Sequence, residues 1–342
     1  MPQPLEGQVA LVAGATRAAG RGIAVELAAA GAKVYCTGRS VRGAPATPGR
    51  PETIEETAEL IEAAGGKAVA LRVDHTVEAE VEALAARIKA DEGRLDVLVN
   101  DVWGGDELVD WEATFWRQDM GPVRALIDQA ILSHWITARH LAPMMVEANR
   151  GLIVEVTDGE TAGYRGQMLY DFVKASVNRM AYAMAWDLAA TRVTALAVSP
   201  GFLRSEAMLD RFGMTEANWR ETASGDFALS ESPRFIGRAI AALAADPKVG
   251  DKAGGAYFAA DLADEYGFTD VDGSKPHFWR NIDAALAKAV AADGDLSDWA
   301  AHHAAGRYQK LHLDPLRAAE AKALAAKLGW TRLGAGLRPI GP

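Results

Sequence analysis

The sequence predicts an α/β fold with a doubly wound (Rossmann-type), mostly parallel sheet of about seven strands and helices on both faces. Short apolar runs alternate along the chain with longer segments in which apolar residues recur at helical spacing. The apolar runs are nearly continuous, as in strands that are buried on both faces. A parallel strand also needs a crossover to return the chain, and the helical segments supply it.

The expected elements begin with a strand at residues 8–15, followed by a helix that ends near Gly31, a residue type common at helix ends. The helix at 51–64 starts with a proline and has acidic residues in its first turn. Further strands are expected at residues 33–38, 68–74, 95–100, 151–157, 192–201 and 255–260. Further helices are expected at residues 78–93, 122–148, 168–189 and 234–245.

This alternation predicts one Rossmann-fold domain over residues 1–270. Residues 271–342 are rich in alanine, helical in pattern and interrupted by glycines. We expect them to form a helical C-terminal extension, and they contain no catalytic motif.

The composition indicates a small-molecule substrate. The chain has 342 residues and a formal net charge of −10, and its basic residues are scattered. Nucleic acids and anionic membranes bind basic surfaces, so neither is an expected partner. No apolar stretch approaches the roughly 18 residues that span a bilayer. With a single cysteine, Cys36, and no signal-peptide pattern, we expect a cytoplasmic protein. No metal site is expected, because the adjacent His302 and His303 cannot both face one ion from a helix.

The turn after the first strand, GATRAAGRG at residues 14–22, has features of a phosphate-binding turn. Its glycines permit close backbone approach, and the following helix presents free N–H groups and the positive end of its dipole. The spacing G-x-G-x-x-G is absent, so the turn alone does not distinguish nucleotide binding from packing.

The end of the second strand bears on the choice of cofactor. An NAD site has a carboxylate there to accept from the ribose 2′-hydroxyl, whereas this chain has Arg39 and Ser40. Arg17 and Arg39 together can grip a 2′-phosphate. We therefore expect NADP(H) in preference to NAD(H), and the alternative is that both arginines are solvated surface residues.

Five landmarks in order resemble the short-chain dehydrogenase/reductase superfamily. They are G-x3-A-x-G at 14–20, RVDHT at 72–76, LVND at 98–101, Tyr170 with Lys174, and SPGFLRS at 199–205. The resemblance extends over nearly the whole of residues 5–265. The stretch LADEYGFTDVDG at 262–273 and a tryptophan-bearing insertion after the fourth strand resemble the subgroup typified by dehydrogenase/reductase family member 1.

The resemblance implies a nicotinamide cofactor bound at the carboxyl ends of the strands. The pyrophosphate turn would comprise Gly14, Thr16, Arg17, Ala18, Ala19 and Gly20. Asp74 would face the adenine, with His75 beside it, and Asn100 would lie near the cofactor. Pro200, Gly201 and Ser205 would hold the nicotinamide end.

The resemblance also implies the catalytic pair. Tyr170 would donate a proton to the substrate oxygen, and Lys174 would contact the nicotinamide ribose while lowering the pKa of the tyrosine. The i, i+4 spacing puts both side chains on one helix face. A nearby ammonium favours the charged form of a phenol whose pKa is ordinarily about 10.

The chain departs from the family pattern at several positions. Ala18 replaces a glycine and adds a methyl group near the pyrophosphate. Asn100 is followed by Asp101 rather than by a second asparagine. The asparagine that often completes a proton relay aligns with Gln129, whose side chain is longer.

The serine that usually polarises the substrate carbonyl has two counterparts here. Counting from GLIV indicates Asp158, whereas counting back thirteen residues from Tyr170 indicates Thr157. The Thr157 hydroxyl would preserve ordinary ketone reduction. An ionised Asp158 only accepts hydrogen bonds, so it would favour a cationic substrate such as an iminium, or take a proton during alcohol oxidation. A protonated Asp158 could still donate, and a purely structural Asp158 would cap its loop.

The insertion after the fourth strand bears on the substrate. Trp103, Trp111, Trp116 and Trp135 lie in or beside it. Packing of the insertion would explain them, and our alternative hypothesis is that some line a pocket for a bulky apolar or aromatic compound. The family usually assembles through the helices at 122–148 and 168–189, so we expect a homodimer or homotetramer.

We therefore expect an enzyme that transfers hydride between NADP(H) and a carbonyl, alcohol or imine. Two other functions remain open. One is a lyase or isomerase that uses Asp158 as a base, and the other is a non-catalytic NADPH-binding sensor. The presence of both Tyr170 and Lys174 argues against the sensor.

Overall fold

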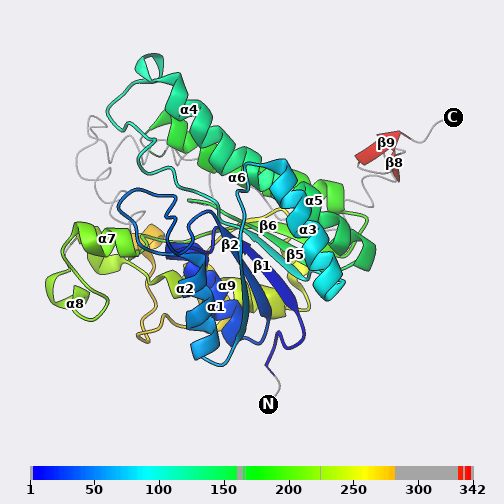
Figure 1. Cartoon of the computed structure of the whole chain (residues 1–342), viewed down its shortest axis with the longest axis horizontal. Helices are drawn as coiled ribbons and strands as arrows, with labels where there is room; N and C mark the ends of the chain where they lie inside the picture. The colour runs from blue at the N-terminus through cyan, green and yellow to red at the C-terminus, as the bar shows by residue number, and fades with distance from the viewer. Residues whose placement is uncertain are drawn as a thin grey trace.

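Seven strands form one parallel sheet in the order β3-β2-β1-β4-β5-β6-β7, which confirms the predicted doubly wound fold (Figure 1). The computed structural model describes residues 3–159, 165, 167–223, 225–281, 330–333 and 336–339. The strands are β1 Val9–Ala13, β2 Lys33–Gly38, β3 Lys67–Arg72, β4 Val97–Asn100, β5 Gly151–Val156, β6 Val193–Ser199 and β7 Ala256–Phe258.

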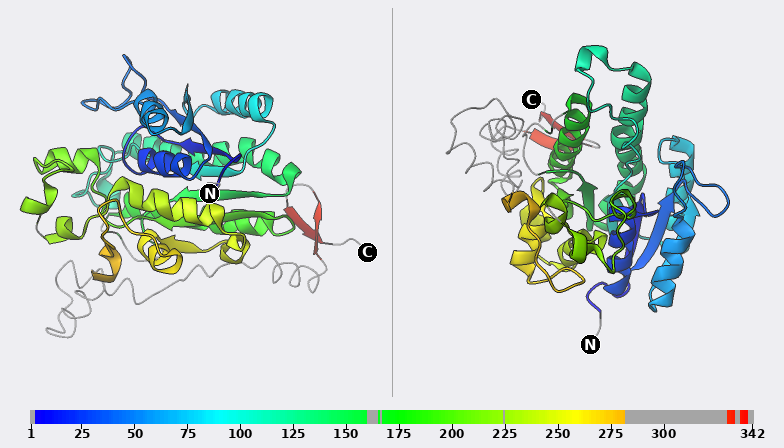
Figure 2. Two further views of the ribbon diagram at one scale, coloured as in Figure 1. Left: turned by 90° about the horizontal axis from the view of Figure 1, so that it is seen from below. Right: turned by 90° about the vertical axis from the view of Figure 1, so that its left-hand side faces the viewer.

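Helices cover both faces of this sheet, as the two views in Figure 2 show. On one face lie α1 Ala18–Ala29, α2 Ile54–Ala63, α9 Pro233–Ala245 and α10 Ala259–Tyr266. On the other lie α3 Glu78–Glu92, α5 Ser133–Ala148 and α6 Met168–Leu188. Alternate residues of β1 enter the two cores, because successive side chains of a strand point to opposite faces.

Local signals in the sequence account for several helix ends. Thr53 and Glu56 form a capping box at the start of α2, in which each side chain accepts from the backbone N–H of the other residue. Gly93 ends α3 with a φ of 67°, a left-handed conformation that glycine adopts without strain.

The helix expected at 122–148 is interrupted. It consists of α4 Met120–Ile127, the π-helical turn η2 Asp128–Leu132 and α5. The Ser133 hydroxyl donates to the carbonyl of Gln129 across this turn at 2.5 Å. Single π-turns inside helices often accompany functional sites, and this turn carries Gln129.

The chain beyond β7 is only partly described. Residues up to 281 return to the loop after β6, where the Trp279 indole N–H donates to the Pro200 carbonyl at 2.9 Å. Strands β8 Trp330–Leu333 and β9 Gly336–Pro339 pair antiparallel, so the predicted helical extension is wrong for these residues. Residues 282–329 of the expected extension lie outside the described part of the chain.

Five short elements complete the loops among the described residues: η1 Phe115–Arg117, α7 Glu206–Arg211, α8 Trp219–Thr222, η3 Gly225–Leu229 and η4 Val249–Lys252. Across the described residues, no helix combines the length and apolar character needed to cross a membrane. The same residues contain no group of three or more histidine, cysteine or acidic side chains placed to hold a metal ion.

Candidate active site

A cavity of about 650 Å³ opens at the carboxyl ends of the strands, where the strand order reverses between β1 and β4. Most of the side chains that the sequence analysis singled out line it. They are Gly14, Thr16, Arg17, Ala18, Ala19, Arg39, Ser40, Asp74, His75, Gln129, Thr157, Asp158, Tyr170, Lys174, Pro200, Gly201 and Ser205. Gly20 and Asn100 are not among the lining residues and lie behind the wall.

The glycine turn packs closely against the end of β4. A Cβ atom on Gly14 would lie 2.4 Å from the Asp101 carbonyl oxygen, and one on Gly20 would lie 2.2 Å from the Gly14 carbonyl oxygen. Ala18 has a φ of 48°, so alanine occupies here the left-handed conformation that favours glycine. Its backbone N–H donates to Glu206 Oε2 at 2.9 Å. A carboxylate from α7 therefore lies at the N-terminus of α1, where anions bind well.

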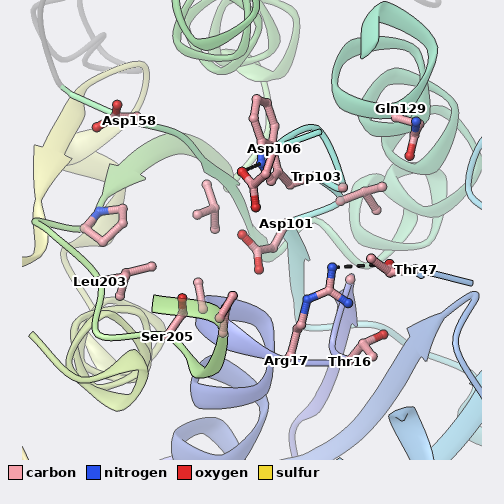
Figure 3. A pocket seen from close by; sticks show the side chains of 18 of the residues that line it. Thr16, Arg17, Thr47, Asp101, Trp103, Asp106, Gln129, Asp158, Leu203 and Ser205 are labelled. Carbon is pink, nitrogen blue, oxygen red and sulfur yellow. Dashed lines mark hydrogen bonds between the residues drawn. The ribbon is translucent and has the colours of Figure 1, made fainter. Parts of the chain in front are cut away.

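The two arginines extend over the cavity from the ends of β1 and β2. Arg17 donates to the Thr47 hydroxyl at 3.3 Å, an interaction that Figure 3 shows. Arg39 donates to Gln129 Oε1 at 2.8 Å. The Gln129 amide oxygen is thus bound by Arg39.

Asp74 and His75 follow β3, and their side chains have different hydrogen-bond partners. The Asp74 carboxylate accepts from the backbone N–H and the hydroxyl of Thr76. The His75 ring lies between the hydroxyls of Thr37 and Thr137, at 2.8 Å from each. Burial lowers the pKa of His75 to about 3, so this ring is neutral at physiological pH.

The Tyr170 hydroxyl donates to Asp158 Oδ2 at 2.8 Å. Loss of contact with water and the neighbouring Asp158 hold the pKa of Tyr170 well above its ordinary value. This direction is opposite to the expected one. The burial of Lys174 lowers the pKa of that ammonium, whose Nζ lies 3.7 Å from the ring centroid of Trp103 and 5.5 Å from that of Tyr170.

Thr157 and Asp158 have separate partners. The Thr157 hydroxyl donates to the backbone carbonyl of Lys174 at 2.9 Å, and the side chain is 2% exposed. Asp158 is the residue in contact with Tyr170, and Arg165 Nε lies 3.8 Å from the same carboxylate oxygen. Thr157 therefore contacts the helix that carries Tyr170 and Lys174, and Asp158 is the one of the two that contacts the Tyr170 hydroxyl.

Sequence reasoning missed a buried network behind the cavity. Asn100 donates to Glu155 Oε1 at 2.7 Å, and His134 Nδ1 lies 2.6 Å from Glu155 Oε2. The other ring nitrogen of His134 lies 3.0 Å from the Val102 carbonyl oxygen. Burial alone would lower the pKa of His134, but the Glu155 carboxylate outweighs it and the net direction is upward. The sequence did not indicate a partner for His134, because His134 lies on α5 and Glu155 lies on β5.

The C-terminal segment contributes to the cavity wall, which the sequence did not indicate. Phe278 and Trp279 are lining residues, and the ring centroid of Phe278 lies 5.8 Å from that of Phe202. Of the four tryptophans considered, Trp103 and Trp111 line the cavity. Trp116 and Trp135 are exposed and do not.

Comparison with known proteins identifies a family. Residues 8–215 match the family model described as short chain dehydrogenase. The chain is 31% identical to mouse (Mus musculus) dehydrogenase/reductase SDR family member 1, over 84% of this chain and 91% of the relative. A metagenomic short-chain oxidoreductase in complex with NADP superposes with a TM-score of 0.55 at 25% identity, over 71% of this chain and 93% of that one. A putative short-chain dehydrogenase/reductase from Burkholderia xenovorans gives a TM-score of 0.61 at 25% identity, covering 75% and 96%.

The Asp101 carboxyl makes stability depend on pH. Loss of contact with water raises its pKa to about 7, against an unfolded value near 3.8. The folded state therefore holds a proton that the unfolded state has lost, and this contribution to stability falls as pH rises from about 4 to 7. Between pH 5 and 8, the wild type is expected to lose about 2–3 kcal/mol relative to Asp101→Asn in urea unfolding without added ligand.

Burial also raises the pKa of Glu231, so Glu231 makes the stability of both proteins depend on pH. The quantity to measure is therefore the difference in unfolding free energy between wild type and Asp101→Asn at each pH. Asp110→Asn, in the same insertion, is the control and should follow the wild-type curve. Parallel pH profiles for wild type and Asp101→Asn would contradict this assignment.

Proposed function

The chain belongs to the short-chain dehydrogenase/reductase family and is therefore an NAD(P)-dependent oxidoreductase, and we propose that it uses NADP(H). Its reaction would be hydride transfer to the carbon of a C=O or C=N bond in a bulky apolar or aromatic compound, or the reverse. The observation that carries the proposal is the hydrogen-bonded Tyr170–Asp158 pair beside the Lys174 ammonium, at the edge of a cavity that begins at a glycine turn.

The glycine turn fits a dinucleotide. Close backbone packing at Gly14 and Gly20 leaves the first turn of α1 open to the cavity. The Ala18 backbone N–H already donates to the Glu206 carboxylate, so an anion fits at this position. A pyrophosphate oxygen would take the place of that carboxylate, and Thr16 and Ala19 would complete the turn.

The second end of the site fits a 2′-phosphate. Arg17 and Arg39 both line the cavity, and no carboxylate follows β2. Planar guanidinium groups bind phosphate strongly, and Ser40 adds a hydroxyl nearby. We therefore propose that NADP(H) is preferred, with Asp74 and His75 at the adenine.

The nicotinamide end would lie against the loop after β6. Pro200, Gly201 and Ser205 line this part of the cavity, with Asn100 buried behind it. Bound there, the cofactor supplies or accepts the hydride. The Trp279 indole N–H donates to the Pro200 carbonyl, and this hydrogen bond fixes the loop after β6.

The protein contributes the proton. Because the pKa of Tyr170 is raised, its phenol is protonated at neutral pH and can act as an acid during reduction. In the resting arrangement the phenol donates a hydrogen bond to Asp158, so the hydroxyl would have to turn from Asp158 to the substrate oxygen to deliver its proton. Lys174 places a positive charge beside both groups, which stabilises the phenolate formed when the proton leaves. Gln129 Oε1 accepts a hydrogen bond from Arg39. Gln129 could therefore take part in a proton relay only after this hydrogen bond breaks.

We also propose that the protein assembles as a homodimer or homotetramer through α5 and α6. Trp135 and Phe172, on these two helices, are 61% and 50% exposed. Large apolar side chains exposed on neighbouring helices are typical of surfaces that a second copy covers.

Replacement of Tyr170 by phenylalanine tests the reaction. The variant is expected to lose at least about 100-fold in kcat, because general acid catalysis contributes roughly that much, with NADPH affinity changed less than about threefold. The change in reduced-nicotinamide absorbance on adding aryl ketones, whose reduction takes a proton on oxygen, measures turnover. Binding of NADPH without turnover of any substrate by the wild type would contradict the proposal and support the sensor.

Arginine substitutions test the cofactor preference. Arg17→Ala and Arg39→Ala are each expected to weaken NADPH binding by about 10–100-fold and NADH binding by less than about threefold, because only NADPH carries the 2′-phosphate. Arg42→Ala is the matched control, since Arg42 pairs with Glu59 at the surface. Equal losses for both dinucleotides, measured by fluorescence titration, would rule out a 2′-phosphate contact.

Removal of the Glu206 charge tests the pyrophosphate site. Glu206→Gln is expected to tighten NADPH binding by about 3–10-fold, because a neutral amide competes less well with an anion for the helix N-terminus. Asp210→Asn is the control on the same helix, where the carboxylate pairs with Arg50. Unchanged or weaker binding by Glu206→Gln would show that the pyrophosphate lies elsewhere.

A further inference from the structure

The reacting end of the cavity is acidic. Asp101, Asp106 and Asp158 all line it, and Figure 3 shows the three side chains. All three interact electrostatically with the Lys174 ammonium. Among the lining residues, the remaining basic side chains are Arg17, Arg39 and Arg211. Arg17 and Arg39 belong to the proposed 2′-phosphate site, so Lys174 faces three carboxylates at the reacting end.

Asp158 places an acceptor where a carbonyl oxygen would need a donor. A carbonyl oxygen gains negative charge as hydride arrives, and an adjacent carboxylate opposes that charge. The Tyr170 proton is already donated to Asp158 Oδ2. Arg165 Nε forms an ion pair with the same oxygen at 3.8 Å, from a position that does not line the cavity, so the other carboxylate oxygen of Asp158 is the one open to a ligand's cation.

Aromatic rings complete this end of the cavity. The Trp103 and Trp111 ring centroids lie 5.6 Å and 5.1 Å from that of Tyr170. The face of Trp103 already holds a cation, because Lys174 Nζ lies 3.7 Å from its centroid. Trp111 is half exposed and presents ring surface to a ligand. Aromatic faces beside carboxylates are the groups that recognise organic cations.

We propose that the substrate of this site is an aryl iminium cation, with the corresponding amine as its reduced partner. The proposal rests on the proposed function and names its substrate class. Asp158 pairs with the positive nitrogen, and Trp103 and Trp111 contact the aromatic part. A carboxylate attracts such a cation by Coulomb attraction, which is stronger in a site that excludes water than in bulk solvent.

The reaction balances without a proton from the protein. Hydride from NADPH forms a C–H bond at the iminium carbon, and the π electrons of the C=N bond become the nitrogen lone pair. NADPH is oxidised to NADP⁺ and the iminium is reduced to a neutral amine. The raised pKa of Tyr170 does not impede this step, because the phenol remains protonated throughout.

A matched pair of substrates tests the proposal with the full chain and NADPH. N-methyl-3,4-dihydroisoquinolinium carries the charge, and α-tetralone is a neutral benzo-fused ketone of similar size, with its reacting carbon also attached to the aromatic ring. The wild type is expected to have a kcat/KM at least about 10-fold higher for the cation. Asp158→Ser should lower turnover of the cation by about 10-fold and raise turnover of the ketone, because a hydroxyl restores a donor. Asp187→Asn, at the far end of α6, should leave both rates unchanged.

A binding measurement accompanies the rates. N-methylisoquinolinium should quench tryptophan fluorescence of the protein without cofactor, and Asp158→Asn should weaken its binding by about 5–10-fold. The thermal midpoint of each variant verifies folding.

Equal turnover of cation and ketone, or an unchanged ratio in Asp158→Ser, would overturn the iminium proposal and leave the oxidoreductase assignment intact. Failure of both substrates with NADPH bound would overturn the proposed function and the iminium proposal together.

Discussion

The close contact between the glycine turn and the end of β4 is the constraint on which the cavity depends. Gly14 lies against the Asp101 backbone, and Gly20 lies against Gly14, with no room for a Cβ atom at either position. This contact holds β1 and β4 together at the point where the strand order reverses. Because the sheet is parallel and covered on both faces, its polar residues gather at this edge rather than on a solvated face.

Several carboxylates lie around this contact. Asp101 stands beside the start of α1, where the backbone N–H of Gly20 and the dipole of the helix favour a negative charge, although loss of water raises its pKa. Glu206 satisfies the amide of Ala18 from the other side. Behind them, Glu155 binds both Asn100 and His134, and His134 in turn holds the Val102 carbonyl. The segment that carries Asp101 and Trp103 is thereby fixed by a buried ion pair rather than by the family's usual neutral asparagine and glycine.

Most of the fold could be predicted from the sequence because its signals are local. Apolar runs, helix-capping residues and terminal glycines act over a few residues, and they located each strand of the parallel sheet. The π-turn at Asp128–Leu132 carries no such signal and was missed. The strands at Trp330–Leu333 and Gly336–Pro339 were missed for another reason, because alanine-rich sequence before them favoured a helical interpretation of the whole extension.

The sequence by itself determined the family, the parallel sheet and the set of side chains that meet at its carboxyl edge, since these follow from residue types and their order. Only the tertiary structure decided that Asp158 rather than Thr157 contacts Tyr170, and that Gln129 contacts Arg39. It also decided the direction in which the pKa of Tyr170 is shifted. Hydrogen-bond partners and loss of water depend on distances between segments far apart in the chain, and no local pattern of residues records those distances.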